Sequence, residues 1–274
     1  MMTDIAMIGP LPQIGYGTWN RPGDEAYRGV VDALEIGYRH IDTAEGYKNE
    51  EFVGKAIADS GVPRGDIFLT TKVAPESFAP GQIMGHVETS LEKLRTDAVD
   101  LLLLHYPSIN DEYEMEDYVG QFAKVYDKGL TRNIGVSNFT IRHLDKAIEL
   151  LGSRKLVTNQ VEIHVFMQNR TIVDHSRSRG LSTTAYSPLA RGAVAGHPVI
   201  AEIAENHGAT DAQVALAFLM AEGHIVIPSS GKRERIAENF KAKDLLLGSD
   251  DMRRLRGLEE GRRLINGPWC PKWD

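Results

Sequence analysis

Short apolar segments alternate with amphipathic segments along almost the whole chain. Eight of the apolar segments are rich in Leu or β-branched residues and are bounded by polar or glycine positions, the pattern of strands buried on both faces. They occupy residues 13–19, 38–43, 67–72, 99–106, 132–137, 157–163, 182–187 and 225–229. The chain is therefore predicted to contain eight buried strands.

The stretches between these strands carry apolar residues at helical spacing. Amphipathic helices are predicted at residues 25–36, 50–58, 82–94, 118–127, 144–151 and 212–221. Several are followed by a helix-ending glycine, as at Gly37 and Gly152. Strand–helix alternation implies parallel strands joined by right-handed crossovers. An open doubly wound sheet would show the same alternation, but eight units favour an α/β fold of the closed (β/α)8 TIM barrel type.

Length and composition agree with a single globular unit. The chain has 274 residues, which suits one barrel of roughly 250 residues better than two small domains. We expect one domain, 1–274, that ends in an irregular tail after Leu258. Hydrophobic residues make up 42% and charged residues 25% of the chain, as in ordinary globular proteins. The net charge of −7 argues against general binding to nucleic acid.

The start of the chain and its cysteine content bear on cellular location and on metal binding. The first residues, Met-Met-Thr-Asp-Ile-Ala, lack the basic and apolar segments of a signal peptide. No apolar run approaches the roughly 20 residues needed to span a bilayer. We therefore expect a cytoplasmic protein with no membrane partner, and a monomer. One cysteine, Cys270, leaves neither an internal disulfide nor a thiolate metal set, so no metal site is predicted.

Four chemically distinct residues stand at or near the ends of three predicted strands. Asp42 ends the run Tyr-Arg-His-Ile-Asp, Lys72 ends Ile-Phe-Leu-Thr-Thr-Lys, and His105 ends Val-Asp-Leu-Leu-Leu-Leu-His. Tyr47 follows Asp42 by five residues. Parallel barrels place their chemistry at the carboxyl ends of their strands. Each residue alone has an ordinary structural explanation, as a turn cap, an ion pair, a surface aromatic or a core histidine, but their joint placement favours a catalytic group.

These four side chains could form a proton relay. A tyrosine hydroxyl, with an ordinary pKa of about 10, is a weak acid unless a cation stabilises its phenolate. Lys72 could supply that cation, and Asp42 could fix Lys72 in place. His105 could hydrogen-bond the oxygen that receives the proton and so orient a carbonyl group.

The chain resembles the aldo-keto reductase superfamily from Leu11 to its last residues. Motifs in that family's order are Gly-Tyr-Gly-Thr-Trp (15–19), Gly-Tyr-Arg-His-Ile-Asp-Thr-Ala (37–44), Thr-Lys (71–72), Leu-Leu-His (103–105), Ile-Gly-Val-Ser-Asn-Phe (134–139), Asn-Gln-Val-Glu (159–162), Ala-Tyr-Ser-Pro-Leu (185–189) and Ile-Pro-Ser-Ser (227–230). Within the superfamily it is most similar to bacterial 2,5-diketo-D-gluconate reductases of the B type. That narrower likeness rests on Ser-Gly-Val-Pro-Arg (60–64), Lys-Leu-Arg-Thr-Asp (93–97) and the terminal Trp-Asp (273–274).

The resemblance implies a catalytic tetrad and a nicotinamide cofactor. It makes Asp42, Tyr47, Lys72 and His105 the tetrad, with Tyr47 as the proton donor. It assigns the nicotinamide carboxamide to a polar trio and the nicotinamide ring to Tyr186, which would stack on it. The trio is Ser137, Asn138 and Gln160. The remaining cofactor positions implied are Thr18, Asp42, Ser187, Leu189, Ser229, Ser230 and Asn239. A hydrogen-bond ladder and a core aromatic are the structural alternatives for the trio and for Tyr186.

A basic segment after the last predicted strand suggests that the cofactor is NADP(H). Lys232, Arg233 and Arg235 lie at the start of a helix, where backbone N–H groups and the helix dipole also favour an anion. A 2′-phosphate would suit this cluster. Many relatives carry Lys at the position of Ser229, so the preference depends on these three cations. A solvated basic helix start is the structural alternative.

The substrate pocket is predicted to be wider than in many relatives. Trp19, Tyr47, His105 and Tyr106 are the expected substrate contacts. Relatives often have Trp at the places of Ala74 and Tyr106, so an apolar wall is missing here. We expect NADPH-dependent reduction of small aldehydes and ketones, with 2,5-diketo-D-gluconate and methylglyoxal as candidate substrates.

Two other functions remain open from the sequence. A Schiff-base lyase would use Lys72 as its nucleophile, although a neighbouring Asp42 favours the ammonium form and so opposes this role. A nucleotide-sensing binding subunit would keep the fold without turnover, although the complete tetrad argues against it.

Overall fold

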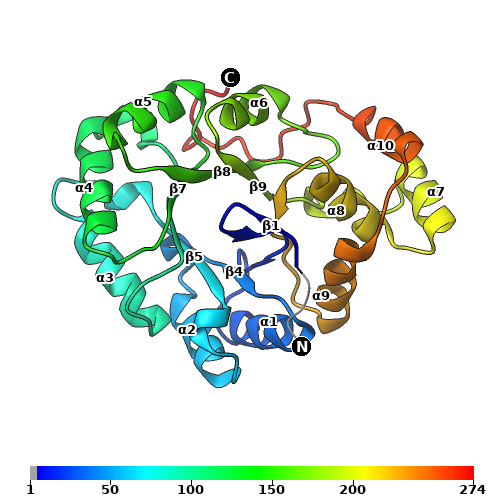
Figure 1. Ribbon diagram of the computed structural model, residues 1–274, viewed down its shortest axis with the longest axis horizontal. Coiled ribbons are helices and arrows are strands. Elements are labelled where there is room, and N and C mark those ends of the chain that lie inside the picture. Colours follow the sequence, from blue (N-terminus) through cyan, green and yellow to red (C-terminus); the bar gives the residue numbers. More distant parts are fainter. Residues whose placement is uncertain (1–4) are drawn as a thin grey trace.

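An eight-stranded parallel barrel forms the centre of the computed structural model, which describes residues 5–274 (Figure 1). Its strands are β3 (Tyr16–Gly17), β4 (His40–Asp42), β5 (Phe68–Val73), β6 (Leu101–Leu104), β7 (Ile134–Ser137), β8 (Leu156–Glu162), β9 (Ser182–Tyr186) and β10 (Ile225–Val226). Each strand pairs with the next along the chain. A parallel bridge between Ile14 and Val226 closes the ring. The predicted (β/α)8 barrel is confirmed.

Helices surround this ring on the outside (Figure 1). They are α1 (Gly23–Ile36), α2 (Glu50–Asp59), α3 (Ile83–Leu94), α4 (Met115–Asp127), α5 (Ile141–Leu151), α6 (Arg170–Ser178), α7 (Pro198–His207), α8 (Asp211–Ala221), α9 (Arg233–Phe240) and α10 (Ser249–Arg256). One helix follows each strand up to β8, whereas α7 and α8 both lie between β9 and β10. In the described residues no helix is both long and apolar enough to cross a membrane.

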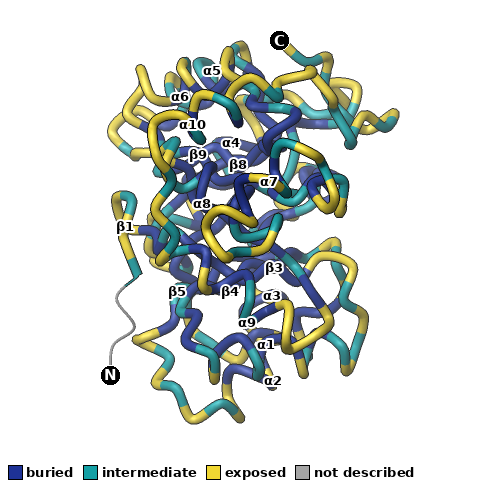
Figure 2. The backbone as a smooth tube through the Cα atoms, turned by 90° about the vertical axis from the view of Figure 1, so that its right-hand side faces the viewer, coloured by how far each residue is buried: buried dark blue, intermediate teal, exposed yellow. Residues whose placement is uncertain are grey.

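A short hairpin before the barrel closes the end where the strands begin. It pairs β1 (Met7–Ile8) with β2 (Leu11–Pro12). Leu11 packs with Leu101 and Ile225, the first residues of β6 and β10, and Ile8 lies against the same cluster. Figure 2 shows this segment at one edge of the molecule. The other end of the barrel, where the strands finish, is therefore the end left for chemistry.

Strand β6 illustrates why a run of apolar residues predicts a strand that is buried on both faces. Its four leucines alternate between two packing regions, as side chains on a strand must. Leu101 and Leu103 pack inside the barrel with the hairpin, and Leu102 and Leu104 pack in the larger core toward the helices. All four are at most 1% exposed. Each buried leucine contributes about 1.5–3 kcal/mol, which fixes the strand and thus the place where His105 emerges.

The predicted helices are all present, and their first residues differ from the prediction by one to three positions or agree with it. Sequence patterns missed α6, α7 and the β1–β2 hairpin. Helix α6 buries Ile172, Val173 and Ser176, and α7 buries Ile200, Ile203 and Ala204. So few inward positions give no clear helical period. The expected tail after Leu258 contains no helix or strand.

Candidate active site

Lys72 is the centre of the tetrad. Its Nζ donates to Asp42 Oδ1 at 2.5 Å, to the Thr43 carbonyl at 2.8 Å and to the Tyr47 hydroxyl at 3.3 Å. Asp42 and Lys72 are each 1% exposed. Neighbouring strands place them, because Asp42 on β4 pairs in register with Thr70, two residues before Lys72 on β5. Three acceptors satisfy the three N–H groups of the ammonium.

The surroundings set the protonation of Lys72 and Tyr47. Burial alone would lower the pKa of Lys72, but the Asp42 carboxylate and Tyr47 outweigh it and the pKa is raised. Burial raises the pKa of Tyr47, and the positive charge of Lys72 opposes that rise. Near neutral pH the pair is therefore an ammonium facing a protonated phenol. The charge that stabilises a phenolate is already in place when the proton leaves.

His105 faces Tyr47 from the end of β6. Its backbone N–H donates to the Val73 carbonyl at 3.0 Å. The two aromatic rings meet edge to face, with centroids 5.6 Å apart and an interplanar angle of 74°. Burial and the charge of Lys72 hold the pKa of His105 well below its usual value, so the imidazole is neutral. A neutral imidazole can donate one hydrogen bond without replacing Tyr47 as the acid.

The polar trio is connected to the tetrad by hydrogen bonds. Gln160 Nε2 donates to Asp42 Oδ2 at 2.8 Å, and Ser137 Oγ donates to the Gln160 carbonyl at 2.8 Å. Asn138 Nδ2 donates to the His105 carbonyl at 3.0 Å. The Tyr186 hydroxyl donates to Asn138 Oδ1 at 2.8 Å. Side chains predicted to hold the nicotinamide thus lie together at the ends of β7, β8 and β9, next to the four tetrad residues.

Backbone strain marks the same strand ends. Asn138 has φ 61° and Ser187 has φ 50°, although neither is glycine. Left-handed conformations of such residues are costly and concentrate at ligand sites. Amide and hydroxyl groups there offer both donors and acceptors, as a carboxamide requires. The residues present therefore fit a nicotinamide group.

The three predicted phosphate-binding cations do not share one environment. Arg233 pairs with Asp32 and with Glu35, the latter at 2.7 Å, and so holds α9 against α1. Lys232 and Arg235 are exposed, and neither forms an ion pair with any residue from 5 to 274.

The other predicted cofactor residues lie in the neighbouring loops and in α9. Thr18 Oγ1 donates to the Asp42 carbonyl at 3.1 Å, and Ser230 Oγ accepts from the Lys232 N–H at 3.2 Å. Asn239 is buried within α9, and Leu189 lies where the loop after β9 begins its turn Ala190–Gly192.

One cation near Ser229 was not found from the sequence. Arg21 Nε donates to Ser229 Oγ at 3.2 Å, and Arg21 Nη1 donates to Glu25 Oε1 at 2.5 Å, so a guanidinium lies beside Ser229. Arg21 lies over 200 residues away in sequence, in the loop between β3 and α1, so no local motif indicates it. Only the closed ring of strands makes the two loops neighbours.

The aromatic side chains predicted to contact the substrate come from distant segments. Trp19 is 48% exposed, and the Arg191 guanidinium lies 5.3 Å from its ring centroid. The Tyr106 ring lies 5.4 Å from the His105 ring, and burial raises the pKa of Tyr106 to about 12. Ala74 directly follows β5, two residues beyond Lys72.

The C-terminal tail is held next to these aromatics. The buried Glu162 carboxylate accepts the backbone N–H groups of Leu264 at 2.6 Å and Ile265 at 3.0 Å. Trp269 follows them in the tail. It lies close enough to Tyr106 to oppose, by hydrogen bonding, part of the rise in the Tyr106 pKa that burial causes. The sequence predicted an irregular tail here but not its position beside Tyr106, because the tail residues show no periodicity that would place them.

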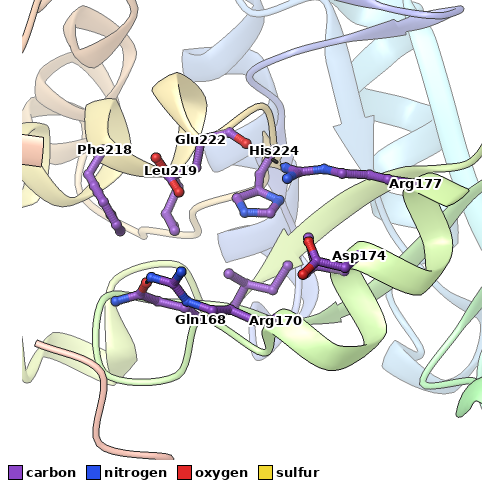
Figure 3. A pocket seen from close by; sticks show the side chains of 10 residues that line it. Gln168, Arg170, Asp174, Arg177, Phe218, Leu219, Glu222 and His224 are labelled. Atoms are coloured by element: carbon purple, nitrogen blue, oxygen red, sulfur yellow. Dashed lines mark hydrogen bonds between the residues drawn. The ribbon is translucent and has the colours of Figure 1, made fainter. Parts of the chain in front are cut away.

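A separate cavity lies between α6 and α8, away from the tetrad (Figure 3). None of the residues predicted for the catalytic or cofactor site lines it. Arg177 donates to the Glu222 carbonyl at 2.5 Å, and His224 Nδ1 lies 2.7 Å from Thr183 Oγ1. These contacts hold α6 and the end of α8 in place. In residues 5–274 no group of three or more His, Cys, Asp or Glu residues could hold a metal ion.

Comparison with known proteins identifies the family. Residues 13–260 match the Aldo/keto reductase family. The chain therefore belongs to that family, as its motifs indicated. Methylglyoxal reductase DkgB of Escherichia coli O157:H7 is 44% identical over 265 residues, which cover 96% of this chain and 99% of the relative. An aldo-keto reductase of Mycolicibacterium smegmatis is 42% identical over 258 residues, covering 94% and 93%.

Solved structures agree with the sequence relatives. A structure named for 2,5-diketo-D-gluconic acid reductase B superposes with a TM-score of 0.93 at 38% identity, covering 100% of this chain and 98% of that one. Aldose reductase from Schistosoma japonicum gives a TM-score of 0.89 at 34% identity, covering 96% and 95%. The protein is an oxidoreductase that reduces carbonyl groups with a nicotinamide cofactor.

Proposed function

We propose that the protein is an NADPH-preferring reductase of small aldehydes and ketones in which Tyr47 protonates the carbonyl oxygen. The observation that carries the proposal is the buried Lys72 ammonium, which contacts both the Asp42 carboxylate and the Tyr47 hydroxyl. A phenol becomes a useful acid only where its conjugate base is stabilised, and this contact supplies that stabilisation.

Each tetrad member has a distinct part in the proposed reaction. A bound nicotinamide supplies the hydride that reaches the carbonyl carbon. Tyr47 transfers its proton to the carbonyl oxygen, and Lys72 stabilises the phenolate that remains. Asp42 keeps Lys72 charged and in place. His105, neutral because of burial and Lys72, donates a hydrogen bond that orients the oxygen toward Tyr47.

A preference for NADPH over NADH is proposed from the charges near the start of α9. Lys232 and Arg235 have no acidic partner among residues 5–274, so their full charge is free for a 2′-phosphate. Arg21, next to Ser229, is a third cation near the same loop, but its guanidinium is paired with Glu25 at 2.5 Å, so we expect it to contribute less than Lys232 and Arg235. Arg233 is already paired with two carboxylates and is expected to contribute little.

Small dicarbonyl compounds are the proposed substrates. The relative from Escherichia coli O157:H7 is named a methylglyoxal reductase, and one similar structure is named for 2,5-diketo-D-gluconic acid reductase B. Ala74 leaves the pocket without a large wall directly after β5, and Tyr106 offers a hydroxyl beside His105. Such a pocket suits compact, polar carbonyl compounds better than large apolar ones.

The lyase alternative is not favoured by the structure. A Schiff-base lysine must be neutral to attack, which requires a lowered pKa. The pKa of Lys72 is instead raised, because Asp42 and Tyr47 outweigh the effect of burial. No observation favours a sensing role without turnover.

A carbonyl panel tests the proposal. We expect the purified protein to oxidise NADPH in the presence of methylglyoxal and 2,5-diketo-D-gluconate, followed by absorbance, and to do so faster than it oxidises NADH. Larger apolar ketones serve as the comparison. No NADPH oxidation with any carbonyl compound would overturn the proposal, and so would a borohydride-trapped adduct of substrate with Lys72.

A further inference from the structure

The proposed acid is the one tetrad residue that does not sit on or directly after a strand. Asp42 and Lys72 belong to β4 and β5, and His105 directly follows β6. Tyr47 instead ends a single 3₁₀ turn, η1 (Glu45–Tyr47). Strands hold their side chains through the barrel, but a three-residue turn needs anchors of its own. The position of the Tyr47 hydroxyl therefore depends on what fixes η1.

Glu45 supplies such an anchor at the start of the turn. Its Oε2 accepts the backbone N–H of Ala74 at 3.1 Å and the Ser77 hydroxyl at 3.2 Å. Its Oε1 contacts His86 Nδ1 on α3. The Glu45 side chain is 18% exposed, so these bonds are partly shielded from water. The carboxylate thus joins η1 to the segment that continues β5 beyond Lys72.

The rest of the turn offers few other anchors. Gly46 is exposed, and apart from its two chain neighbours no residue from 5 to 274 lies within 4 Å of the position where a Cβ would be. The following Lys48 is exposed and has φ 56°, where the chain turns back. Asn49 then secures the next residues by donating to the Thr18 and Arg21 carbonyls, both at 2.9 Å. Of the two turn residues that precede Tyr47, Glu45 is the one whose side chain joins the turn to the segment directly after β5, the strand that carries Lys72.

We propose that Glu45 is a positioning residue that ties turn η1 to the end of β5 and so sets the distance between the Tyr47 hydroxyl and Lys72 Nζ. The proposal rests on the proposed function, since it gives Glu45 an effect only through Tyr47 as the acid. It extends the site to Ser77 and His86, which complete the carboxylate's contacts. A displacement of about 1 Å in a reacting group can cost about 100-fold in rate.

The first test compares three variants in single-turnover reduction of methylglyoxal with bound NADPH. Glu45→Ala should slow the reductive step by about 10-fold to 100-fold, with the Kd for NADPH changed less than about 2-fold. Glu45→Gln should recover most of the rate, because an amide can still accept from the Ala74 N–H and hydrogen-bond to the His86 ring. Asp145→Ala removes another carboxylate that contacts a histidine, His175, and serves as the matched control with an unchanged rate.

The second test asks whether Glu45 acts through Tyr47. Glu45→Ala should slow the reductive step in the wild-type background but have no further effect when Tyr47 is already phenylalanine. A role of Glu45 in general stability would lower the rate by the same factor in both backgrounds. Thermal unfolding of each variant identifies loss of folded protein.

The outcomes separate the two proposals. A Tyr47→Phe variant as fast as the wild type would overturn the proposed function itself. A slow Tyr47→Phe together with a fast Glu45→Ala would leave that function standing and refute the positioning role. Failure of Glu45→Gln to recover the rate, or equal losses in both backgrounds, would also refute it.

Discussion

The end of the barrel carries two clusters of charge that differ in almost every physical respect. The tetrad cation Lys72 is buried, has an acidic partner and contacts three acceptors. The cations at the start of α9 lie on an exposed helix turn, and Lys232 and Arg235 have no acidic partner in residues 5–274. The first cluster is held together by internal contacts, whereas we propose that the second is completed by the phosphate of a bound cofactor.

This difference determines how each cluster should respond to substitution. In a buried site each charge interacts strongly with a few neighbours, and removing one leaves the others without compensation. Exposed charges interact through water and salt, so neighbouring cations can substitute for one another. We therefore expect large and specific losses at the tetrad, and smaller, shared losses at α9.

Tyr47→Phe should produce the largest loss of activity. The change removes the transferable proton but keeps the ring that packs against His105, so the Kd for NADPH should change little. Loss of a general acid costs about 10²-fold to 10⁴-fold in rate. Steady-state kinetics with methylglyoxal, together with fluorescence titration of NADPH, measures both effects. Wild-type turnover in this variant would show that another group supplies the proton.

Lys72→Met should be the most destabilising change at the tetrad. It leaves the Asp42 carboxylate buried without its cation, and breaking such a pair costs about 3–5 kcal/mol. Urea denaturation at neutral pH measures this loss in the free energy of unfolding. Because the folded pKa of Lys72 is raised, this contribution is present at neutral pH and disappears only as pH rises through that value.

A second variant checks that explanation. Lys72→Met combined with Asp42→Leu removes both charges, and should recover part of the stability without recovering activity. If the double variant were less stable than Lys72→Met alone, the uncompensated carboxylate would not be the cause.

Lys232→Ala and Arg235→Ala should each weaken NADPH binding by about 10-fold, near the lower limit for charged hydrogen bonds because both side chains are exposed. NADH has no 2′-phosphate, so its affinity should stay within about 2-fold. Titrating both cofactors at two salt concentrations measures the effect, and higher salt should shrink the difference between wild type and variants. Equal losses of affinity for NADPH and NADH would mean that these cations do not bind the 2′-phosphate.

The barrel and the tetrad could be predicted because they depend on local patterns. Runs such as Leu101–Leu104 indicate strands, and a parallel barrel brings the residues after each strand to one end. Knowing that Asp42, Lys72 and His105 lie at or next to the ends of their strands is then enough to predict that they meet. Helix α5 was predictable for the same reason, since its buried residues recur at helical spacing.

Contacts between distant loops could not be predicted in this way. Arg21 reaches Ser229 only because the loops that carry them are neighbours in the closed barrel, and Glu45 reaches His86 only because turn η1 lies beside α3. The environment of Arg233 could not be predicted for the same reason. Its sequence neighbours suggest an anion site, but its guanidinium faces Asp32 and Glu35 on a helix about 200 residues earlier.

Arg233→Ala should have the smallest effect, and it separates structural from ligand-binding cations at the same helix start. Its ion pairs with Asp32 and Glu35 are exposed and screened, so we expect a fall in Tm of at most about 2 °C. NADPH affinity should stay within about 2-fold, in contrast to Lys232→Ala and Arg235→Ala. Differential scanning fluorimetry and the same cofactor titration test both expectations. A 10-fold loss of NADPH affinity with unchanged NADH binding would show that Arg233 leaves its carboxylates to bind the phosphate, and that the division of the three cations by their partners is wrong.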